Sequence, residues 1–405
     1  MRRCLSVIVA ALLACLTLAA CGGDDGGSFD ERVGGDETTV DDSAGVTAKS
    51  IAIGVHGPKS GPAASLVADV FTGFELYVDK INADGGVNGR TLEVEVVDDQ
   101  FTVAGGTAAG KELAQGDVMV AVNLAGAESA VGAQPALERG AIPYLQVALP
   151  LAKLEGSKTT FSLGTPLELT ASAVPSFAAT ELDAGTKTVA ILSEADDIYQ
   201  EMVGGVRDNA ADAGIEIAAE EVVDGTASSF RPALFKLREA GADVVILVGG
   251  LAVPGILRDA KSIGFEPTWT GSGPWTTDFI NAVAEGAMEG IQAVRANGGV
   301  DAPGFDEFAA AWKADTPPTE LGFLGWTHAT NIAAMLERLG DDPSRSALVE
   351  MLETETEDDP IAASEAQPPL SYTAERHWAS DEVLPSTVRD GVWVATGEFT
   401  QRFGE

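Results

Sequence analysis

The sequence predicts an α/β protein made of two units, each a parallel sheet flanked by helices. From residue 50 onward, short apolar runs alternate with longer amphipathic stretches, an order typical of parallel sheets. This alternation is interrupted near residues 161–166 and then begins again, which indicates a second unit of similar architecture. The chain is 45% hydrophobic, so a body of about 350 residues can bury the cores of two such units.

The first unit is predicted from an alternating series of strands and helices. The strands are expected at 51–55, 92–97, 118–122 and 143–147. The helices between them are expected at 62–82, 104–115 and 129–139. Strand, helix and strand in succession imply parallel pairing with the helices on the faces of the sheet.

The second unit repeats the pattern, and the end of the chain departs from it. Helices are expected at 167–181, 199–213, 230–240 and 253–263, and strands at 188–192, 216–222 and 244–248. Two further helices are expected at 304–313 and 324–339. A hairpin is predicted around Asp390-Gly391, because this dipeptide suits a tight turn.

An apolar leader at the N-terminus predicts export from the cytoplasm. Arg2 and Arg3 precede an uncharged run over 4–20, which is too short to span a membrane and ends abruptly. The run closes on Leu18-Ala19-Ala20-Cys21, which resembles a bacterial lipobox, and Cys21 is then lipidated and becomes the first mature residue. The alternative is an ordinary secretory peptide that happens to contain a cysteine.

Composition excludes several classes of function. Of the three cysteines, Cys4 and Cys15 lie in the leader and Cys21 directly follows it, so the body has no thiol for a disulfide, a thiolate metal site or cysteine catalysis. The net charge of −37 argues against a nucleic-acid partner, since phosphates are bound by basic patches. Residues 22–48 hold eight acidic side chains against Arg32 alone, which predicts a solvated tether over 21–49.

Six segments stand out for their sequence: 53–62 (IGVHGPKSGP), 79–90 (DKINADGGVNGR), 97–100 (VDDQ), 140–143 (GAIP), 241–247 (GADVVIL) and 256–260 (ILRDA). In this order along the chain, they resemble the leucine/isoleucine/valine-type solute-binding proteins of bacterial ABC importers. The resemblance covers roughly residues 50–400.

The resemblance implies two Rossmann-like lobes with parallel-type sheets, the type I periplasmic binding protein fold. The lobes are joined by three crossovers, which we place near Phe161, Val294 and Gln367. The first lobe then comprises 50–165 and 292–366, and the second comprises 166–291 and 367–405. The leader is 1–20 and the tether 21–49.

The resemblance also implies a solute site in the cleft between the lobes. In amino-acid binders of this family, two loops of the first lobe and an acidic group of the second hold the zwitterion. Here those loops are 123–129, which contains Gly126, Ala127 and Glu128, and 146–150, which contains Ala148 and Leu149. Pro150 replaces an expected threonine and Gly273 an expected acid, which argues against an ordinary branched-chain amino acid. Tyr199 matches the aromatic residue that closes over the ligand.

The remaining candidates at the cleft are aromatic, apolar or basic. Trp275 and Trp326 favour a ligand with an apolar body and one polar end, unless they only pack between lobe and loop. Lys59, Ser60 and the start of the helix at Pro62 could hold an anion, although Lys59 could equally be a solvated lysine. His56 ends the first strand and is expected to face the cleft, the alternative being a histidine bonded to backbone.

Other motifs are weaker. His328 is expected to be structural, and the segment around His377 is not placed. The stretch 105–111 (GGTAAGK) has phosphate-loop spacing, but Glu112 replaces the magnesium-binding hydroxyl and the stretch lies in an expected helix. Residues 85–89 are expected to form a turn, since they follow a helix and precede a strand.

We therefore expect that the protein is not an enzyme and needs no cofactor, because the sequence has no nucleophile elbow. We also expect no metal site, because no two histidines have metal-ligand spacing. The expected function is capture of a small organic solute, either an amino acid or an apolar or aromatic carboxylate or amide. The expected partners are an ABC permease with its ATPase and the lipid bilayer through Cys21, and the protein is expected to be a monomer. The alternative is a sensory lipoprotein that reports the ligand to a membrane receptor.

Overall fold

A computed structural model describes residues 41–61, 63–147, 150–401 and 403. The leader, the lipidation site at Cys21 and the tether up to residue 40 lie outside this part of the chain. Ala148 and Leu149, two of the expected ligand-binding residues, also lie outside it.

Five parallel strands form the first sheet, in the order β2-β1-β3-β4-β5. They are β1 (Ser50–Gly57), β2 (Thr91–Asp98), β3 (Val120–Asn123), β4 (Tyr144–Gln146) and β5 (Thr160–Ser162). The connecting helices are α2 (Ala64–Ala83), α3 (Val103–Gln115), α4 (Ala127–Arg139) and the short α5 (Leu151–Leu154). We call this sheet and the helices packed on it the first lobe.

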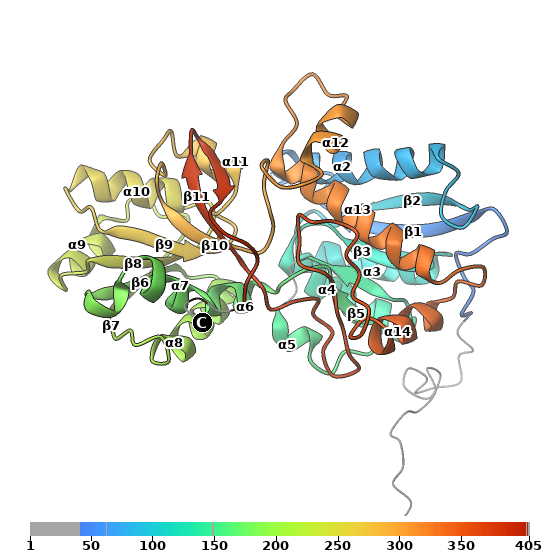
Figure 1. The fold of residues 1–405 in the computed structure, drawn as a ribbon, viewed down its shortest axis with the longest axis horizontal. Helices are drawn as coiled ribbons and strands as arrows, with labels where there is room; N and C mark the ends of the chain where they lie inside the picture. The colour runs from blue at the N-terminus through green and yellow to red at the C-terminus, as the bar shows by residue number, and fades with distance from the viewer. Residues whose placement is uncertain (1–40, 62, 148–149, 402, 404–405) are drawn as a thin grey trace, which may run out of the picture.

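Four parallel strands form the second sheet, in the order β7-β6-β8-β9. They are β6 (Val189–Glu194), β7 (Ile217–Val223), β8 (Val244–Val248) and β9 (Thr268–Ser272). Its helices are α6 (Leu167–Ser172), α7 (Val174–Glu181), η1 (Ala184–Thr186), α8 (Asp197–Ala210), α9 (Arg231–Glu239), α10 (Val253–Ser262) and α11 (Asp278–Val283). This is the second lobe, and with it the predicted fold class is confirmed: two parallel sheets, each flanked by helices (Figure 1).

A small antiparallel sheet completes the second lobe. It joins β10 (Gln292–Arg295), β11 (Leu384–Arg389) and β12 (Val392–Ala395). Val388 and Trp393 lie in the same hydrophobic cluster as β8 and α10. The predicted hairpin is confirmed, because Asp390 (φ 52°) and Gly391 (φ 81°) supply the two left-handed residues of its turn.

Three late helices return to the first lobe. They are α12 (Phe305–Ala311), α13 (Glu320–Arg338) and α14 (Arg345–Thr354). In Figure 1, α13 lies beside α2, although the two are far apart in sequence. Their backbones approach closely at Gly73 and Gly325, where an added methyl group would collide with Gly322 and Val70 respectively.

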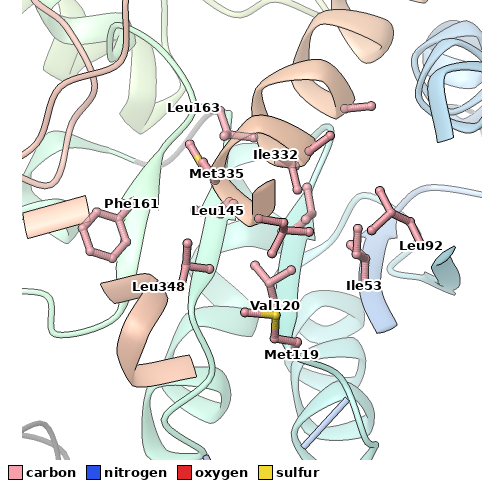
Figure 2. Packing of buried hydrophobic residues seen from close by; sticks show 14 of the residues in the cluster. Ile53, Leu92, Met119, Val120, Leu145, Phe161, Leu163, Ile332, Met335 and Leu348 are labelled. Atoms are coloured by element: carbon pink, nitrogen blue, oxygen red, sulfur yellow. The ribbon is translucent and has the colours of Figure 1, made fainter. Parts of the chain in front are cut away.

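The core of the first lobe depends on these late helices. Ile332, Met335 and Leu348 pack against strand residues such as Val120 and Leu145, as Figure 2 shows. One face of the first sheet is therefore covered by residues from the last third of the chain.

Several elements differ from the prediction. The helix expected over 167–181 is two helices, α6 and α7, which meet at Ala173, with Pro175 in the first turn of α7. Helix α13 begins at Glu320 rather than 324, because the Thr319 side chain caps it by accepting from the Gly322 amide. The helical segments α5, η1, α11 and α14 and the strands β5, β9 and β10 were not predicted.

Two segments pack elsewhere than expected. The third crossover, expected near Gln367, comes later: Leu370, Tyr372 and Ala379 belong to the core of the first lobe, and the Tyr372 hydroxyl donates to the Ser162 carbonyl at 2.7 Å. The expected tether also ends earlier than residue 49. The Asp42 carboxylate accepts hydrogen bonds from the amide and hydroxyl of Ser346 at the start of α14.

Candidate functional site

A cavity of about 190 Å³ lies where the two lobes join. Its walls come from two segments that link the lobes (163–167 and 295–298), from Gln367, from the β9–α11 loop and from the first turns of α13. The apolar lining is Val147, Leu163, Leu167, Pro274, Ala296, Leu321 and Leu324; the polar lining includes Thr165, Thr170, Ser272, Thr276, Thr277, Arg295, Asn297, Glu320, His328 and Gln367. A cavity of this volume, walled by apolar and polar groups together, can hold a small molecule of few atoms.

Three polar side chains in this wall have hydrogen-bonding capacity to spare: Ser272, His328 and Arg295, whose Nη1 has no partner among the described residues. Ser272 ends β9 in the second lobe and is fully buried, and its hydroxyl has no partner among the described residues. His328 lies on α13 in the first lobe, 2% exposed, and neither ring nitrogen has a partner there. Burial lowers the pKa of His328 to about 3, so its imidazole is neutral at physiological pH, with one donating and one accepting nitrogen.

The charged lining residues, Arg295 and Glu320, pair with each other. Arg295 Nη2 contacts Glu320 Oε1, and Arg295 Nε also donates to the Thr276 carbonyl at 3.0 Å. Glu320 Oε2 accepts from the Asp278 amide at 2.8 Å. Burial lowers the pKa of Arg295 to about 10, against the opposing effect of Asp278 and Asp301. At neutral pH the guanidinium therefore stays charged and is neutralised by Glu320.

His56 does not face the cavity, and this corrects our expectation. It is fully buried within the first lobe, with Nδ1 2.8 Å from Asp99 Oδ2 and Nε2 2.7 Å from the Tyr144 hydroxyl. Both faces of a parallel sheet are covered by helices, so the sequence gives no sign of which face a strand residue occupies. Both ring nitrogens are used within the core, which makes His56 a structural histidine here.

Lys59 and Ser60 follow β1 as expected, but a carboxylate of the protein already occupies their donors. Asp98 accepts from the Lys59 amide at 2.9 Å, from the Ser60 amide at 3.3 Å and from the Ser60 hydroxyl. The pKa of Asp98 lies below its usual value. Partial burial opposes this shift, but these hydrogen bonds and one from the Gln100 amide stabilise the carboxylate more strongly. The Lys59 ammonium lies 5.0 Å from the centre of the Phe71 ring.

The other expected residues at strand ends lie outside the cavity wall. Gly126 (φ 95°) precedes α4, with Ala127 and Glu128 in its first turn. Tyr199 is half-buried in the first turn of α8, its hydroxyl beside Gly250, and burial raises its pKa. All four follow the carboxyl ends of strands β3 and β6, the sheet edges at which ligands bind in α/β folds. Their contact with a ligand stays a prediction.

Trp275 and Trp326 are core residues in this structure, not rim residues. Trp275 is fully buried, packs edge-on against Trp393 and donates from Nε1 to the carbonyls of Leu247 and Ser272. Trp326 is 4% exposed and packs with Phe308 and Phe323. The packing alternative weighed for both tryptophans is therefore the arrangement found.

None of the described residues that we expected to contact the ligand lines the cavity, although Gly273, where an acidic residue was expected, does. The residues that do, chiefly Ser272, Arg295, Glu320 and His328, were either passed over or assigned a structural role. Arg295 carried a usable signal, since it adjoins the crossover expected near Val294, whereas Glu320 lies before the helix expected from 324 and carried none. Ser272 and His328 carried none, because isolated serines and histidines are common in cores.

The stretch 105–111 lies inside α3, so it is a helix and not a phosphate loop. Residues 85–89 form the expected turn, closed by a bridge between Val87 and Arg90. Across the described ranges, no group of three or more His, Cys, Asp or Glu side chains is placed to hold a metal ion. A search of the same residues finds no helix with the length and apolar character needed to cross a membrane.

Two α/β lobes, each with a parallel sheet, share a cavity near the segments that join them. This arrangement defines the class of two-lobed solute-binding proteins with the type I periplasmic binding protein fold. The chain belongs to the family described as periplasmic binding protein, whose family model matches residues 50–383. It is a substrate-binding protein of the branched-chain amino acid-binding family of ABC transporters, a family of extracytoplasmic solute receptors rather than enzymes.

Individual relatives agree with this assignment. The leucine-, isoleucine-, valine-, threonine- and alanine-binding protein of Pseudomonas aeruginosa is 26% identical over 311 residues, 75% of this chain and 83% of that protein. A solute-binding protein of an ABC transporter from Rhodopseudomonas palustris, solved with 3,4-dihydroxybenzoic acid, shares the fold at a TM-score of 0.73 and 18% identity, covering 88% of this chain and 98% of the other. A fatty acid ABC transporter substrate-binding protein from Thermomonospora curvata has a TM-score of 0.72 and 19% identity, covering 89% and 95%.

Proposed function

We propose that this protein captures a small organic solute with an apolar body and one polar end, and delivers it to the permease and ATPase of an ABC importer. The observation that carries the proposal is the cavity at the lobe junction, where an apolar lining surrounds buried polar groups supplied by both lobes. A solute in contact with both lobes would favour their closed arrangement.

The acidic groups of the cavity wall argue against a zwitterionic amino acid as the solute. Gly273, which stands where the resemblance predicts an acidic side chain, lines the cavity and offers no carboxylate to an ammonium group. Glu320, the acid that does line it, is already paired with Arg295. The named relatives include one solved with an aromatic acid and one described as a fatty acid binder, so this fold accommodates solutes other than amino acids.

Thermal melting tests the proposal. The protein lacking its first 21 residues is heated with amino acids, aliphatic and aromatic carboxylates, the matching amides, polyols and nucleosides. A solute at 100 times its dissociation constant adds about 2.7 kcal/mol to the free energy of unfolding, which is readily seen as a higher melting temperature. Melting curves unchanged by every solute would contradict solute capture.

Lipid anchoring at Cys21 is part of the same proposal. In the bacterial cell, the wild-type chain should fractionate with membranes and incorporate a labelled fatty acid, and Cys21→Ser should do neither. Cys4→Ser is the control, because Cys4 lies in the part of the leader that is removed. Equal labelling of wild type and Cys21→Ser would contradict the anchor.

Transport is tested in the cell by uptake of the solute that melting identifies. Deletion of this protein, or of its permease, should abolish uptake at low solute concentration. Uptake that persists in both deletions would contradict the importer role.

A further inference from the structure

Ser272 and His328 line the same cavity from opposite lobes. Ser272 is held at the end of β9 by the parallel pairing of β9 with β8, in which Val248 is its partner. His328 lies on α13, which packs tightly against α2. Each side chain is more than nine-tenths buried and has polar atoms with no partner in the described part of the chain.

Leaving such groups without partners is costly. A buried donor or acceptor without a hydrogen bond has lost its contacts with water and gained nothing in return, which lowers the stability of the fold. Most buried polar groups in proteins are therefore paired. Placing several such atoms on one cavity wall makes sense when a bound molecule supplies the missing partners.

The charges of the cavity point to the kind of group that fits. Arg295 and Glu320 neutralise each other, so the pair presents no net charge to a carboxylate or to an ammonium group. The Nη1 of Arg295 is still unpaired and adds a hydrogen-bond donor to this wall, and the neighbouring Glu320 carboxylate would repel a second carboxylate there. The neutral imidazole of His328 and the hydroxyl of Ser272 can each donate one hydrogen bond and also accept. Their best complement is an uncharged group that likewise does both.

We propose that Ser272 and His328 form a clamp, one residue from each lobe, for an uncharged head group that both donates and accepts hydrogen bonds, such as a primary carboxamide or a hydroxyl. This inference rests on the proposed function and narrows its solute class: the cavity takes amides or alcohols in preference to the carboxylates of the same carbon skeleton. Since the partners lie on different lobes, both hydrogen bonds form only when the lobes stand as they do here.

Calorimetric titration with matched pairs of solutes tests the charge preference. Isovaleramide is compared with isovalerate, and benzamide with benzoate, with leucine as the zwitterion, all on the protein lacking its first 21 residues. At least one amide should bind at least ten-fold more tightly than its carboxylate. If isovalerate, benzoate or leucine binds and neither amide does, the proposed clamp is wrong, whereas solute capture stands. If no compound of the wider melting panel binds, both are wrong.

Substitutions test the two residues. Loss of one hydrogen bond to the solute should weaken amide binding about ten-fold, so we expect this for Ser272→Ala and for His328→Leu. His328→Gln keeps a donor and an acceptor and should retain part of the affinity. Without solute, His328→Leu should melt no lower than wild type, because it removes unpaired buried polar atoms.

The chain offers matched controls. Thr270 lies two residues before Ser272 on β9, and Thr327 precedes His328 on α13; both are buried with unpaired hydroxyls, and neither lines the cavity. Thr270→Val and Thr327→Val should therefore leave amide affinity unchanged. Wild-type affinity in both Ser272→Ala and His328→Leu, or equal losses in the controls, would overturn the clamp.

Discussion

Arg295 and Glu320 join the two lobes through a buried ion pair. Arg295 ends β10, which pairs with β11 in the second lobe, whereas Glu320 begins α13, which packs on α2 in the first. The same carboxylate accepts from the Asp278 amide at the start of α11. One side chain of the first lobe is thus held at two points by the second.

Removing the carboxylate should destabilise the protein. Glu320→Leu leaves the Arg295 guanidinium buried without a counter-charge, so we expect the free energy of unfolding to fall by about 3–5 kcal/mol. Urea denaturation of the solute-free protein measures it. The double variant Arg295→Met/Glu320→Leu removes both charges and should recover most of the loss. A single variant as stable as wild type would show that the pair contributes nothing.

The burial of His328 makes stability depend on pH. Its pKa is about 3 in the folded protein against about 6.5 in the unfolded chain, so below pH 6.5 only the unfolded chain binds the proton. Proton binding to the unfolded chain therefore does not lower the free energy of unfolding above pH 6.5. As the pH falls from 6.5 toward 3, it lowers that free energy progressively. Between pH 7 and pH 5 wild type should lose about 2 kcal/mol more than His328→Leu. Urea denaturation at the two pH values measures this difference, and parallel losses would contradict it.

Because α13 packs closely on α2, adding a single methyl group at Gly325 should lower the free energy of unfolding. Gly325→Ala directs its Cβ at the Val70 carbonyl, so α13 must shift and the free energy of unfolding should fall by about 1–3 kcal/mol. Gly204 is the control: it lies within α8 with open space around it, and Gly204→Ala should be neutral or stabilising by up to about 1 kcal/mol. Equal effects at both positions would contradict the tight contact.

Tyr199 remains the sequence-derived candidate for closing over the solute. Tyr199→Ala should weaken the binding of any solute found in the melting screen about ten-fold while leaving the far-ultraviolet circular dichroism unchanged, because the ring is only half-buried. Tyr199→Phe should retain most of the affinity if the ring, and not the hydroxyl, makes the contact. Calorimetry with that solute measures both, and wild-type affinity in Tyr199→Ala would remove this residue from the site.

The sequence predicted the architecture much better than the site. Periodicity located most strands within a few residues, and Asp390-Gly391 fixed the hairpin, because these signals are local. The return of 370–379 to the first lobe depends on contacts such as Tyr372 with Ser162, which no local pattern records. The same applies to His56, whose direction is set by Asp99 and Tyr144 on neighbouring strands.

The site was harder for a further reason. Strand ends were expected to supply it, as in α/β folds generally, and Ser272 does end β9. The strand ends that we selected lie elsewhere, and part of the cavity wall comes from the segments that link the lobes. Residues such as Arg295 and Glu320 meet there only because the chain crosses between the lobes. Their partnership is a property of the assembled molecule, and sequence spacing does not encode it.

The late arrival of α13 and α14 at the first sheet sets an order on folding. All five strands of that sheet have been synthesised by Ser162, yet the helices that cover its face at Val120 and Leu145 begin only at Glu320. A chain synthesised amino end first therefore carries an uncovered apolar surface until its last third has been made. Such long-range closure slows folding and exposes the incomplete chain to aggregation until α13 and α14 can pack on the sheet.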